Sequence, residues 1–143
     1  MKIKIKRIDT SLPLPEYKSK GAAAFDLYAR ENIIVRSQSL GYIPTNLIIQ
    51  TPPGYVLLMA SRSSTPKRGL IIPHGIGIVD ADYCGDADEL ICQVYNITKK
   101  PVHVERGERI GQAMFVKFGR VSQWAEKKII RKKSRGGFGS TGL

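Results

Sequence analysis

The C-terminal segment 135–142 joins glycines to one aromatic ring and two hydroxyl side chains. Four of the seven residues from 136 to 142 are glycine. Because each glycine inside a helix or strand costs roughly 0.5–1 kcal/mol against alanine, the segment predicts a flexible arm. Phe138 could stack on a nucleobase, and Ser140 and Thr141 could donate to phosphate oxygens. Taken alone, such a terminus is more often an unstructured tail, so the interpretation depends on the other segments.

A second candidate segment is Ser-Arg-Ser-Ser-Thr-Pro at residues 61–66. The Arg62 guanidinium, the hydroxyls of Ser63 and Ser64 and the free N–H groups of a helix start could together hold phosphate oxygens. The alternative is a loop whose serines only cap a helix. On this segment alone the two interpretations are comparable.

A third candidate is the pair Asp80 and Asp82, which follows the apolar run 76–79. In an extended chain both carboxylates point the same way and Tyr83 points to the other face, unless a turn intervenes. A carboxylate at a strand end can orient and deprotonate a water molecule. Aspartate also ends strands for local reasons, so a simple turn is the alternative.

Residues 107–113 indicate a turn that enters a strand, with Arg109 and Gln112 as polar members of an apolar run. Gln112 could bridge a phosphate and a water, or it could satisfy a sheet edge. In isolation the second interpretation is favoured.

Many short strands must position these residues. Ile3 and Ile5 alternate with lysines, which predicts a strand with both isoleucines inward. No 12-residue window has a helical apolar stripe, so the chain is predicted to be an all-β sandwich or barrel with at most one short helix. The predicted strands, separated by turn residues, are 2–6, 33–35, 40–43, 47–49, 55–60, 76–79, 90–95, 102–104 and 110–118.

The one plausible helix follows residues 55–60. Thr65 can cap it, Pro66 suits its first position and Gly69 can end it. There is room for little more than one turn.

Composition limits the class of protein. The chain has 143 residues, 42% of them hydrophobic, which fits one domain with an ordinary core. The longest apolar runs are far shorter than the roughly 20 residues of a membrane helix, and the N-terminus lacks a signal sequence. We therefore expect a cytoplasmic protein without membrane partners. Cys84 and Cys92 lack the spacing of a zinc site or disulfide framework, which predicts two reduced thiols.

The net charge of +11 predicts an anionic partner. Six of the nine residues from 127 to 135 are basic. This run is either a solvated tail, a means of attracting a triphosphate or a contact for nucleic acid. We expect a β domain at 1–127 and a basic, glycine-rich arm at 128–143 that closes an active site.

Five segments resemble, in order, the five motifs of the trimeric deoxyuridine triphosphatases (dUTPases). They are residues 23–29, 62–64, 77–85, 107–112 and 136–142. The resemblance implies a jelly-roll-like β fold, a homotrimer whose sites combine motifs from more than one subunit, and Mg²⁺-dependent hydrolysis of dUTP to dUMP and pyrophosphate. Such an enzyme limits uracil in DNA, supplies dUMP for thymidylate synthesis and has no need of nucleic acid.

The resemblance also implies roles for individual residues. Asp80 would be the general base for the attacking water, Gln112 would lie near that water and bind phosphate, and Tyr83 would exclude a ribose 2′-hydroxyl. Asp26 would meet Mg²⁺ through water. The other residues that it implies bind substrate are Arg62, Ser63 and Ser64 for phosphates, Gly75, Gly77, Val79 and Ile91 for uracil in a narrow hairpin, and Arg135, Phe138, Gly139, Ser140 and Thr141 in the arm.

The chain departs from the family pattern at several places. Ser64 stands where glycine is usual, Cys84 replaces an arginine or glutamine, and the segment 86–90 is longer than the common form. The arm's arginine often lies two places earlier, where this chain has Lys133, so either Lys133 or Arg135 could supply the arm's cation.

The sequence argues against three rival functions. The related dCTP deaminases carry Thr-Leu-Glu after the third motif, where residues 90–92 are Leu-Ile-Cys. A basic nucleic-acid-binding module would interleave aromatics with its charges, and only Trp124 lies near the basic run. An inactive relative is opposed by the intact Asp80, Tyr83 and Gln112.

Overall fold

The computed structural model describes residues 1–131, 133–134 and 136–137. Within these residues the chain forms eleven strands and one short 3₁₀ helix, η1. The prediction of an all-β chain with at most one short helix is confirmed. The elements are β1 Lys4–Arg7, β2 Phe25–Tyr28, β3 Ile33–Val35, β4 Leu40–Pro44, β5 Leu47–Gln50, β6 Tyr55–Ala60, η1 Pro66–Arg68, β7 Leu70–Ile71, β8 Ile76–Val79, β9 Ile91–Asn96, β10 Val102–Val104 and β11 Arg109–Lys117.

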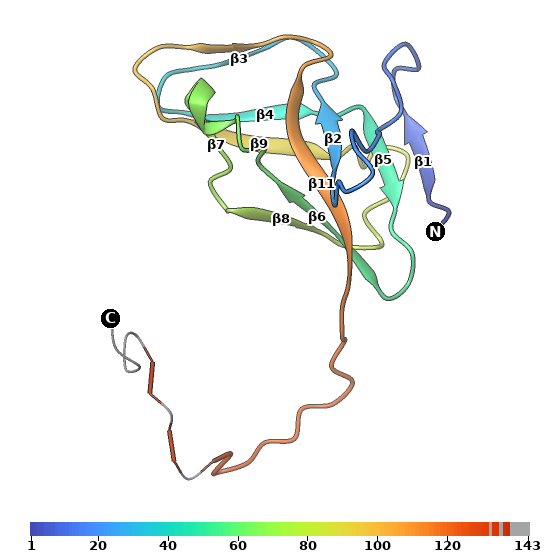
Figure 1. Cartoon of the computed structure of the whole chain (residues 1–143), viewed down its shortest axis with the longest axis vertical. Coiled ribbons are helices and arrows are strands. Elements are labelled where there is room, and N and C mark those ends of the chain that lie inside the picture. Colours follow the sequence, from blue (N-terminus) through green and yellow to red (C-terminus); the bar gives the residue numbers. More distant parts are fainter. Residues whose placement is uncertain (132, 135, 138–143) are drawn as a thin grey trace.

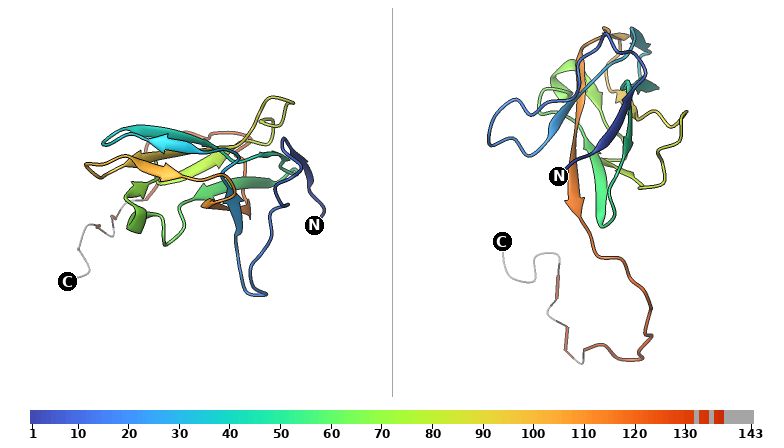
Figure 2. Two further views of the ribbon diagram at one scale, coloured as in Figure 1. Left: turned by 90° about the horizontal axis from the view of Figure 1, so that it is seen from above. Right: turned by 90° about the vertical axis from the view of Figure 1, so that its right-hand side faces the viewer.

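Every strand pair of the described chain is antiparallel. The largest sheet has the order β2-β11-β6-β8, and a second has the order β4-β9-β7. Two further pairs, β1-β5 and β10-β3, complete the body. Figure 1 shows β11 crossing in front of β4 and β9, and Figure 2 shows the strands in stacked layers. The arrangement is the jelly-roll-like packing of sheets expected from the sequence.

One hydrophobic core lies between these layers. Leu27, Ile43, Leu57, Val94 and Val104, from five different strands, are at most 1% exposed. Apolar burial of this kind stabilises a fold by about 25 cal/mol per Å² removed from water. The strands therefore form a single packed unit on which the site residues are mounted.

Both cysteines of the described chain are free, as predicted. Cys92 is buried in the core, and burial raises the pKa of its thiol to about 12. Cys84 is only partly buried and lies in the loop after β8.

The predicted strands agree with the observed ones to within two residues at each end, and four of them coincide with the bounds of β3, β6, β8 and β10. Two strands were missed. All four residues of β2 are buried, including Asp26, so β2 lacks the alternation that identifies a strand. β7 has only two residues, which is too short for a recognisable pattern.

The short helix is present as η1, with Pro66 at its start as predicted. Gly69 ends it with a φ of 79° and donates its N–H to the carbonyl of Pro66 at 2.9 Å. Thr65 stands at the N-cap position as predicted, but its side chain makes no capping hydrogen bond. Thr65 already has helical angles, and its Oγ1 accepts from the N–H of Arg62 at 3.1 Å instead.

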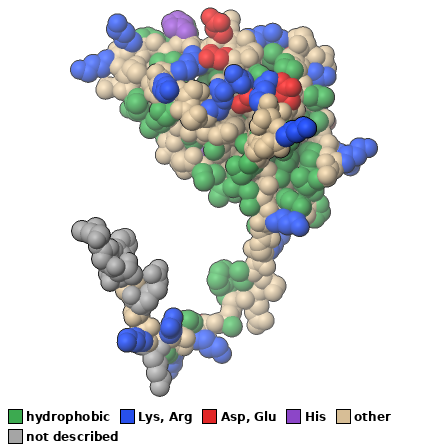
Figure 3. All heavy atoms as spheres, viewed as in Figure 1, with side chains coloured by type: hydrophobic (Ala, Val, Ile, Leu, Met, Phe, Trp, Pro, Cys, Tyr) green, Lys and Arg blue, Asp and Glu red, His purple; other side chains and the backbone are tan. Residues whose placement is uncertain are grey.

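After β11 the chain leaves the body. Residues 118–131 form neither helix nor strand and are exposed, and Figures 1 and 2 show them leading away from the sheets. Trp124 and Ile130 are 85% and 86% exposed. Figure 3 shows basic side chains gathered along this segment. No helix in the described part of the chain is long and apolar enough to cross a membrane.

Candidate active site

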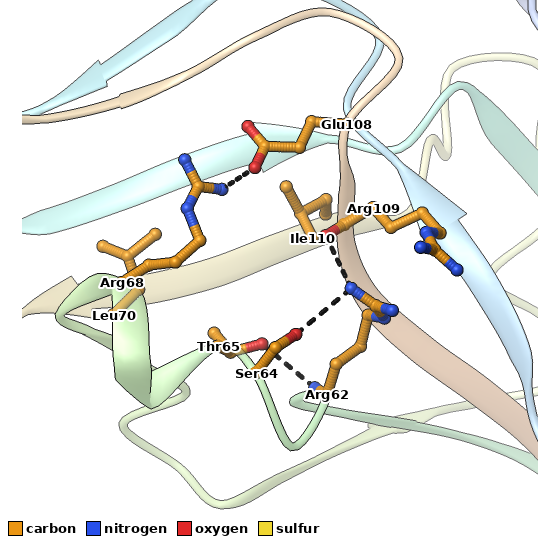
Figure 4. A pocket seen from close by; sticks show the side chains of 8 residues that line it. All are labelled: Arg62, Ser64, Thr65, Arg68, Leu70, Glu108, Arg109 and Ile110. Carbon is orange, nitrogen blue, oxygen red and sulfur yellow. Dashed lines mark hydrogen bonds and ion pairs between the residues drawn. The ribbon is translucent and has the colours of Figure 1, made fainter.

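Two arginines share the carboxylate of Asp26. Arg62 Nε lies 2.9 Å from Asp26 Oδ1, and Arg109 Nη1 lies 3.2 Å from Asp26 Oδ2. The Asp26 side chain is 11% exposed, so its charge needs these partners. Arg62 Nη1 also donates to Ser64 Oγ at 3.2 Å (Figure 4). Two guanidinium charges against one carboxylate leave the cluster with a net positive charge.

This cluster borders an open cavity of about 240 Å³. On its other wall Arg68 of η1 forms an ion pair with Glu108, as Figure 4 shows. The lining residues are Arg62, Ser64, Thr65, Arg68, Leu70, Glu108, Arg109 and Ile110. Guanidinium groups and a hydroxyl at one cavity favour an anion such as phosphate.

The loop after β6 presents Arg62 and Ser64 to the cavity because it closes into a tight turn. The N–H of Thr65 donates to the carbonyl of Arg62 at 3.0 Å, and Thr65 Oγ1 accepts in return from the N–H of Arg62. Ser63 is exposed and is not among the residues that line the cavity. Of the predicted phosphate segment, the structure therefore brings Arg62 and Ser64 together and leaves Ser63 at the rim.

Gln112 joins the same region from β11. It lies opposite Asp26 on β2 and opposite Ala60 on β6. Its Nε2 donates to the carbonyl of Ser61 at 2.9 Å, on the loop that carries Arg62. Three of the predicted site residues, Asp26, Arg62 and Gln112, thus meet at one end of β6.

Asp80 follows β8 directly and is exposed. Of the two alternatives left open by the sequence, an extended run and a turn, the structure shows the turn. The N–H of Tyr83 donates to the carbonyl of Asp80 at 3.2 Å, and the N–H of Cys84 donates to the carbonyl of Asp82 at 3.0 Å. Asp82 therefore does not follow the strand alternation that would pair it with Asp80. Asp80 is left as the acid at the strand end.

The ring of Tyr83 is held at the far end of the same loop. Its hydroxyl donates to the carbonyl of Glu89 at 3.2 Å. Glu89 is itself fixed, since its Oε1 accepts from Arg30 Nε at 2.9 Å and from the N–H of Asn46 at 2.7 Å. The loop between β8 and β9 is thus anchored to the body at Glu89.

Within one chain Asp80 is remote from the cavity. Val79 pairs with Leu57 and Ile76 pairs with Ala60, so Asp80 lies beside Val56 at the start of β6. Arg62 lies beyond the other end of β6. Val56 is level with Asp80, and Arg62 lies six residues further along the chain. At about 3.3 Å per residue of extended chain, the separation is about 20 Å.

The predicted uracil-reading residues divide between two sheets. Gly75 has a φ of 75° in the turn before β8, and Gly77 lies on β8 where an added Cβ would approach Met59 Cβ at 3.3 Å. Val79 ends β8, which is the edge strand of its sheet. Ile91 begins β9 in the other sheet, paired with Pro44. The expected hairpin of β8 and β9 is wrong as a strand pair, because β8 pairs with β6 and β9 with β4 and β7.

The arm residues Arg135, Phe138, Gly139, Ser140 and Thr141 lie outside the described residues. Lys133, the other candidate for the arm's cation, is described and exposed. The proposed closure of the arm stays a prediction.

Metal ligands are sparse near the cavity. In residues 1–131, 133–134 and 136–137 no three His, Cys, Asp or Glu side chains are clustered as a metal site. Mg²⁺ commonly keeps several waters and uses one or two carboxylates with substrate phosphates. The single carboxylate of Asp26 fits that mode, because its two oxygens offer about four acceptor sites and each is engaged by one arginine.

Sequence reasoning gave no site role to Arg109, Arg68 or Glu108. Arg109 was recognised as a polar residue in an apolar run, but nothing in its local sequence indicated Asp26 as its partner, 83 positions away. Arg68 and Glu108 form a pair from separate parts of the chain. Such long-range ion pairs leave no signal in a single sequence.

Comparisons with known proteins agree with this geometry. The family model described as dUTPase matches residues 10–142. The deoxyuridine 5′-triphosphate nucleotidohydrolase of Dictyoglomus turgidum is 36% identical over 150 residues, covering 100% of this chain and 99% of the relative. That of Rickettsia typhi is 37% identical over 154 residues, covering 100% and 98%. The crystal structure of dUTPase from Streptococcus mutans has a TM-score of 0.76 at 28% identity, over 83% of this chain and 98% of that chain.

Proposed function

The chain belongs to the dUTPase family and hydrolyses dUTP, and from this premise we propose how its residues divide the reaction. The triphosphate lies in the cavity beside Arg62, Ser64 and Gln112, with Ser63 at the rim. The observation that carries this assignment is the sharing of Asp26 by Arg62 and Arg109, which builds a positively charged anion site at a strand end.

Asp80 is the general base in this proposal. Its carboxylate is exposed at the end of β8, where it can hold a water and take its proton. The water oxygen bonds to the α-phosphorus as the bond from that phosphorus to the bridging oxygen breaks. The products are dUMP and pyrophosphate, and the pyrophosphate carries the bridging oxygen away.

Charge on the phosphates grows in the transition state, and arginines offset it. The guanidinium of Arg62 offers such a charge beside the cavity, and Asp26 and Ser64 already orient it. Mg²⁺ supplies further charge neutralisation when it is bound with the triphosphate, and Asp26 would hold it through water. Asp26 therefore has two tasks, to orient Arg62 and to receive the hydrated ion.

Base and sugar selection fall to the β8 region. The free edge of β8 between Gly75 and Val79 offers backbone donors and acceptors to uracil, with Ile91 nearby, and the fixed ring of Tyr83 lies under the deoxyribose. The residues Arg135, Phe138, Gly139, Ser140 and Thr141 close over the base and phosphates. In this proposal residues 128–143 act as the arm that closes the site and residues 1–127 as the scaffold.

We propose that the working form is a homotrimer whose sites are shared between subunits. The separation of about 20 Å between Asp80 and the Arg62 cavity along β6 supports this, because a single chain cannot bring both to one triphosphate. Exposed apolar side chains offer surface for such contacts: Ile76 is 54% exposed, Ile78 70% and Tyr42 56%. A cytoplasmic location and independence from nucleic acid stay predictions of the sequence.

Two measurements test the proposal. Purified protein with Mg²⁺ should release pyrophosphate from dUTP and only slowly from dTTP, dCTP and UTP; equal rates on all four would reject the assigned selection. Light scattering on the same sample should give about three times the 15.9 kDa chain mass. An active protein with the mass of one chain would refute the shared site.

A further inference from the structure

Strand β11 contains an irregularity at its start. Arg109 pairs with Tyr28 of β2, and Gly111 pairs with Leu27, so two steps along β11 correspond to one step along β2. Ile110 is the extra residue, as in a β-bulge. A bulge shifts the side chains on one side of it to the opposite face of the strand.

The shift decides which side chains share the face of Asp26. In a regular strand Arg109 and Gln112, three positions apart, would point to opposite faces. Here their partners on β2 are Tyr28 and Asp26, which are two positions apart and so share a face. The bulge therefore places Arg109 beside Gln112 and Asp26 rather than on the far side of the sheet.

Arg109 then makes contact with the site through two groups. Its guanidinium Nη1 lies 3.2 Å from Asp26 Oδ2, and its carbonyl accepts from Arg62 Nη1 at 3.5 Å (Figure 4). Arg62 takes the other carboxylate oxygen, at 2.9 Å. One residue thus restrains both members of the Asp26–Arg62 pair.

We propose that Arg109 is a positioning residue for the phosphate site, acting through Asp26 and Arg62. With Arg109 present, Asp26 is neutralised and Arg62 keeps its charge for the phosphates. Without Arg109, Arg62 is left as the one arginine paired with Asp26, and the pair presents no net positive charge to the phosphates. The inference rests on the proposed binding of phosphate at Arg62.

Arg106 provides a matched control. It lies three positions earlier in the same turn and is also ion-paired to an aspartate, with 2.5 Å between its Nη2 and Asp9 Oδ2. Its side chain is 43% exposed, against 44% for Arg109. Arg106 is outside the set of residues that line the phosphate cavity. Arg106→Gln and Arg109→Gln therefore remove the same charge from arginines of similar exposure, although Asp9 is 33% exposed and Asp26 11%.

The test is calorimetric binding of a non-hydrolysable α,β-imido analogue of dUTP to Arg109→Gln, Arg109→Lys, Arg106→Gln and Arg62→Gln proteins, with dUMP as the second ligand. Thermal melting establishes that each variant folds. For Arg109→Gln we expect analogue affinity about tenfold weaker, a magnitude typical of one lost charge-assisted contact, and a smaller loss for dUMP. Arg109→Lys keeps the charge and should recover part of the loss, while Arg106→Gln should bind as the wild type does.

A purely structural role of Arg109 would lower the affinities for both ligands equally. The ratio of the affinity for the analogue to the affinity for dUMP therefore distinguishes a structural role from a positioning role. A double-mutant cycle tests whether Arg109 acts through Asp26. If Arg109 acts through Asp26, its removal in an Asp26→Asn background should cost less than in the wild type.

Two results would overturn the inference. Loss of analogue affinity in Arg62→Gln with none in Arg109→Gln removes the role of Arg109 alone. No loss in either variant removes phosphate binding from this cavity, and with it the proposed function on which the inference depends.

Discussion

The separation of Asp80 from Arg62 makes a quantitative prediction about mixed subunits. In the proposed mechanism, Asp80→Asn removes the general base and Arg62→Gln removes a phosphate ligand. Each homogeneous variant should lose most of its kcat, since no site then contains both groups. The Asp80 variant should still bind the dUTP analogue, because its carboxylate acts on water rather than on the base.

When the two variants assemble at random in equal amounts, activity should return. A site that takes Asp80 from one chain and Arg62 from another is intact only if the first chain is an Arg62→Gln chain and the second an Asp80→Asn chain. Each choice has a probability of one half, so about a quarter of the sites should be intact. If one chain supplied both residues, no site would be intact.

The assay is co-expression of the two variants in equal amounts with different tags, pull-down through each tag to establish that mixed oligomers form, and measurement of pyrophosphate release from the whole unfractionated pool. Two mixtures with the double variant, which carries both Asp80→Asn and Arg62→Gln, serve as controls. Asp80→Asn with the double variant should stay inactive, because neither chain carries Asp80. Wild type with the double variant should retain about a quarter of the activity if sites are shared, and about a half if they are not. Mixed oligomers with no recovered activity in the complementary pair would refute the reasoning.

Three further predictions concern the rest of the chain. Deleting residues 136–143 should abolish most turnover while melting temperature and oligomer mass stay unchanged, and normal kcat in the truncated protein would remove the arm from the mechanism. Ellman's reagent at pH 8 should label one thiol, Cys84, in the native protein and both after denaturation, because burial raises the pKa of Cys92 to about 12; labelling of Cys92 without unfolding would contradict its burial. Hydrogen bonds from Arg106 and then Ser11 hold the pKa of Asp9 well below its ordinary value of 3.8, so the ionised form stabilises the fold above that value and the stabilisation is lost as the pH falls below it. Denaturant unfolding should therefore show Asp9→Asn less stable than wild type at pH 7, with the difference shrinking below about pH 4, and a constant difference would exclude the ion pair as its cause.

Local pattern accounts for most of the strands that could be predicted. Ile3 and Ile5 alternate with lysines, and both pack against the core as expected, Ile5 within β1 and Ile3 just before it. The apolar runs of β6 and β8 are bounded by turn residues, so their ends were also found. β2 was missed because Asp26 lies buried within it, and a charged residue in a fully buried strand contradicts the pattern by which strands are recognised. The residue that hides this strand from sequence prediction is thus the site residue Asp26.

The site was predicted in parts rather than as an assembly. Family motifs identified Asp26, Arg62 and Gln112, which the structure brings together, and they contained Arg109 without assigning it a role. The position of Arg109 depends on the bulge at Ile110, and a bulge is a property of two paired strands rather than of one. The sequence likewise left open whether the chain after Asp80 extends or turns, and hydrogen bonds within residues 80–84 close it into turns.

Strand β6 explains why the two halves of the site keep a fixed relation. It lies between β11 and β8, so one strand sets the level of Gln112 on one side and of Val79 on the other. Leu57 and Met59 are 0% and 6% exposed, which holds β6 rigidly in the core. Because packed cores resist small displacements, the phosphate cavity at one end and Asp80 at the other move as one body. In the proposed shared site, catalysis then depends on how neighbouring chains are joined, since no flexing within a chain of this kind could close a gap of about 20 Å between the two groups.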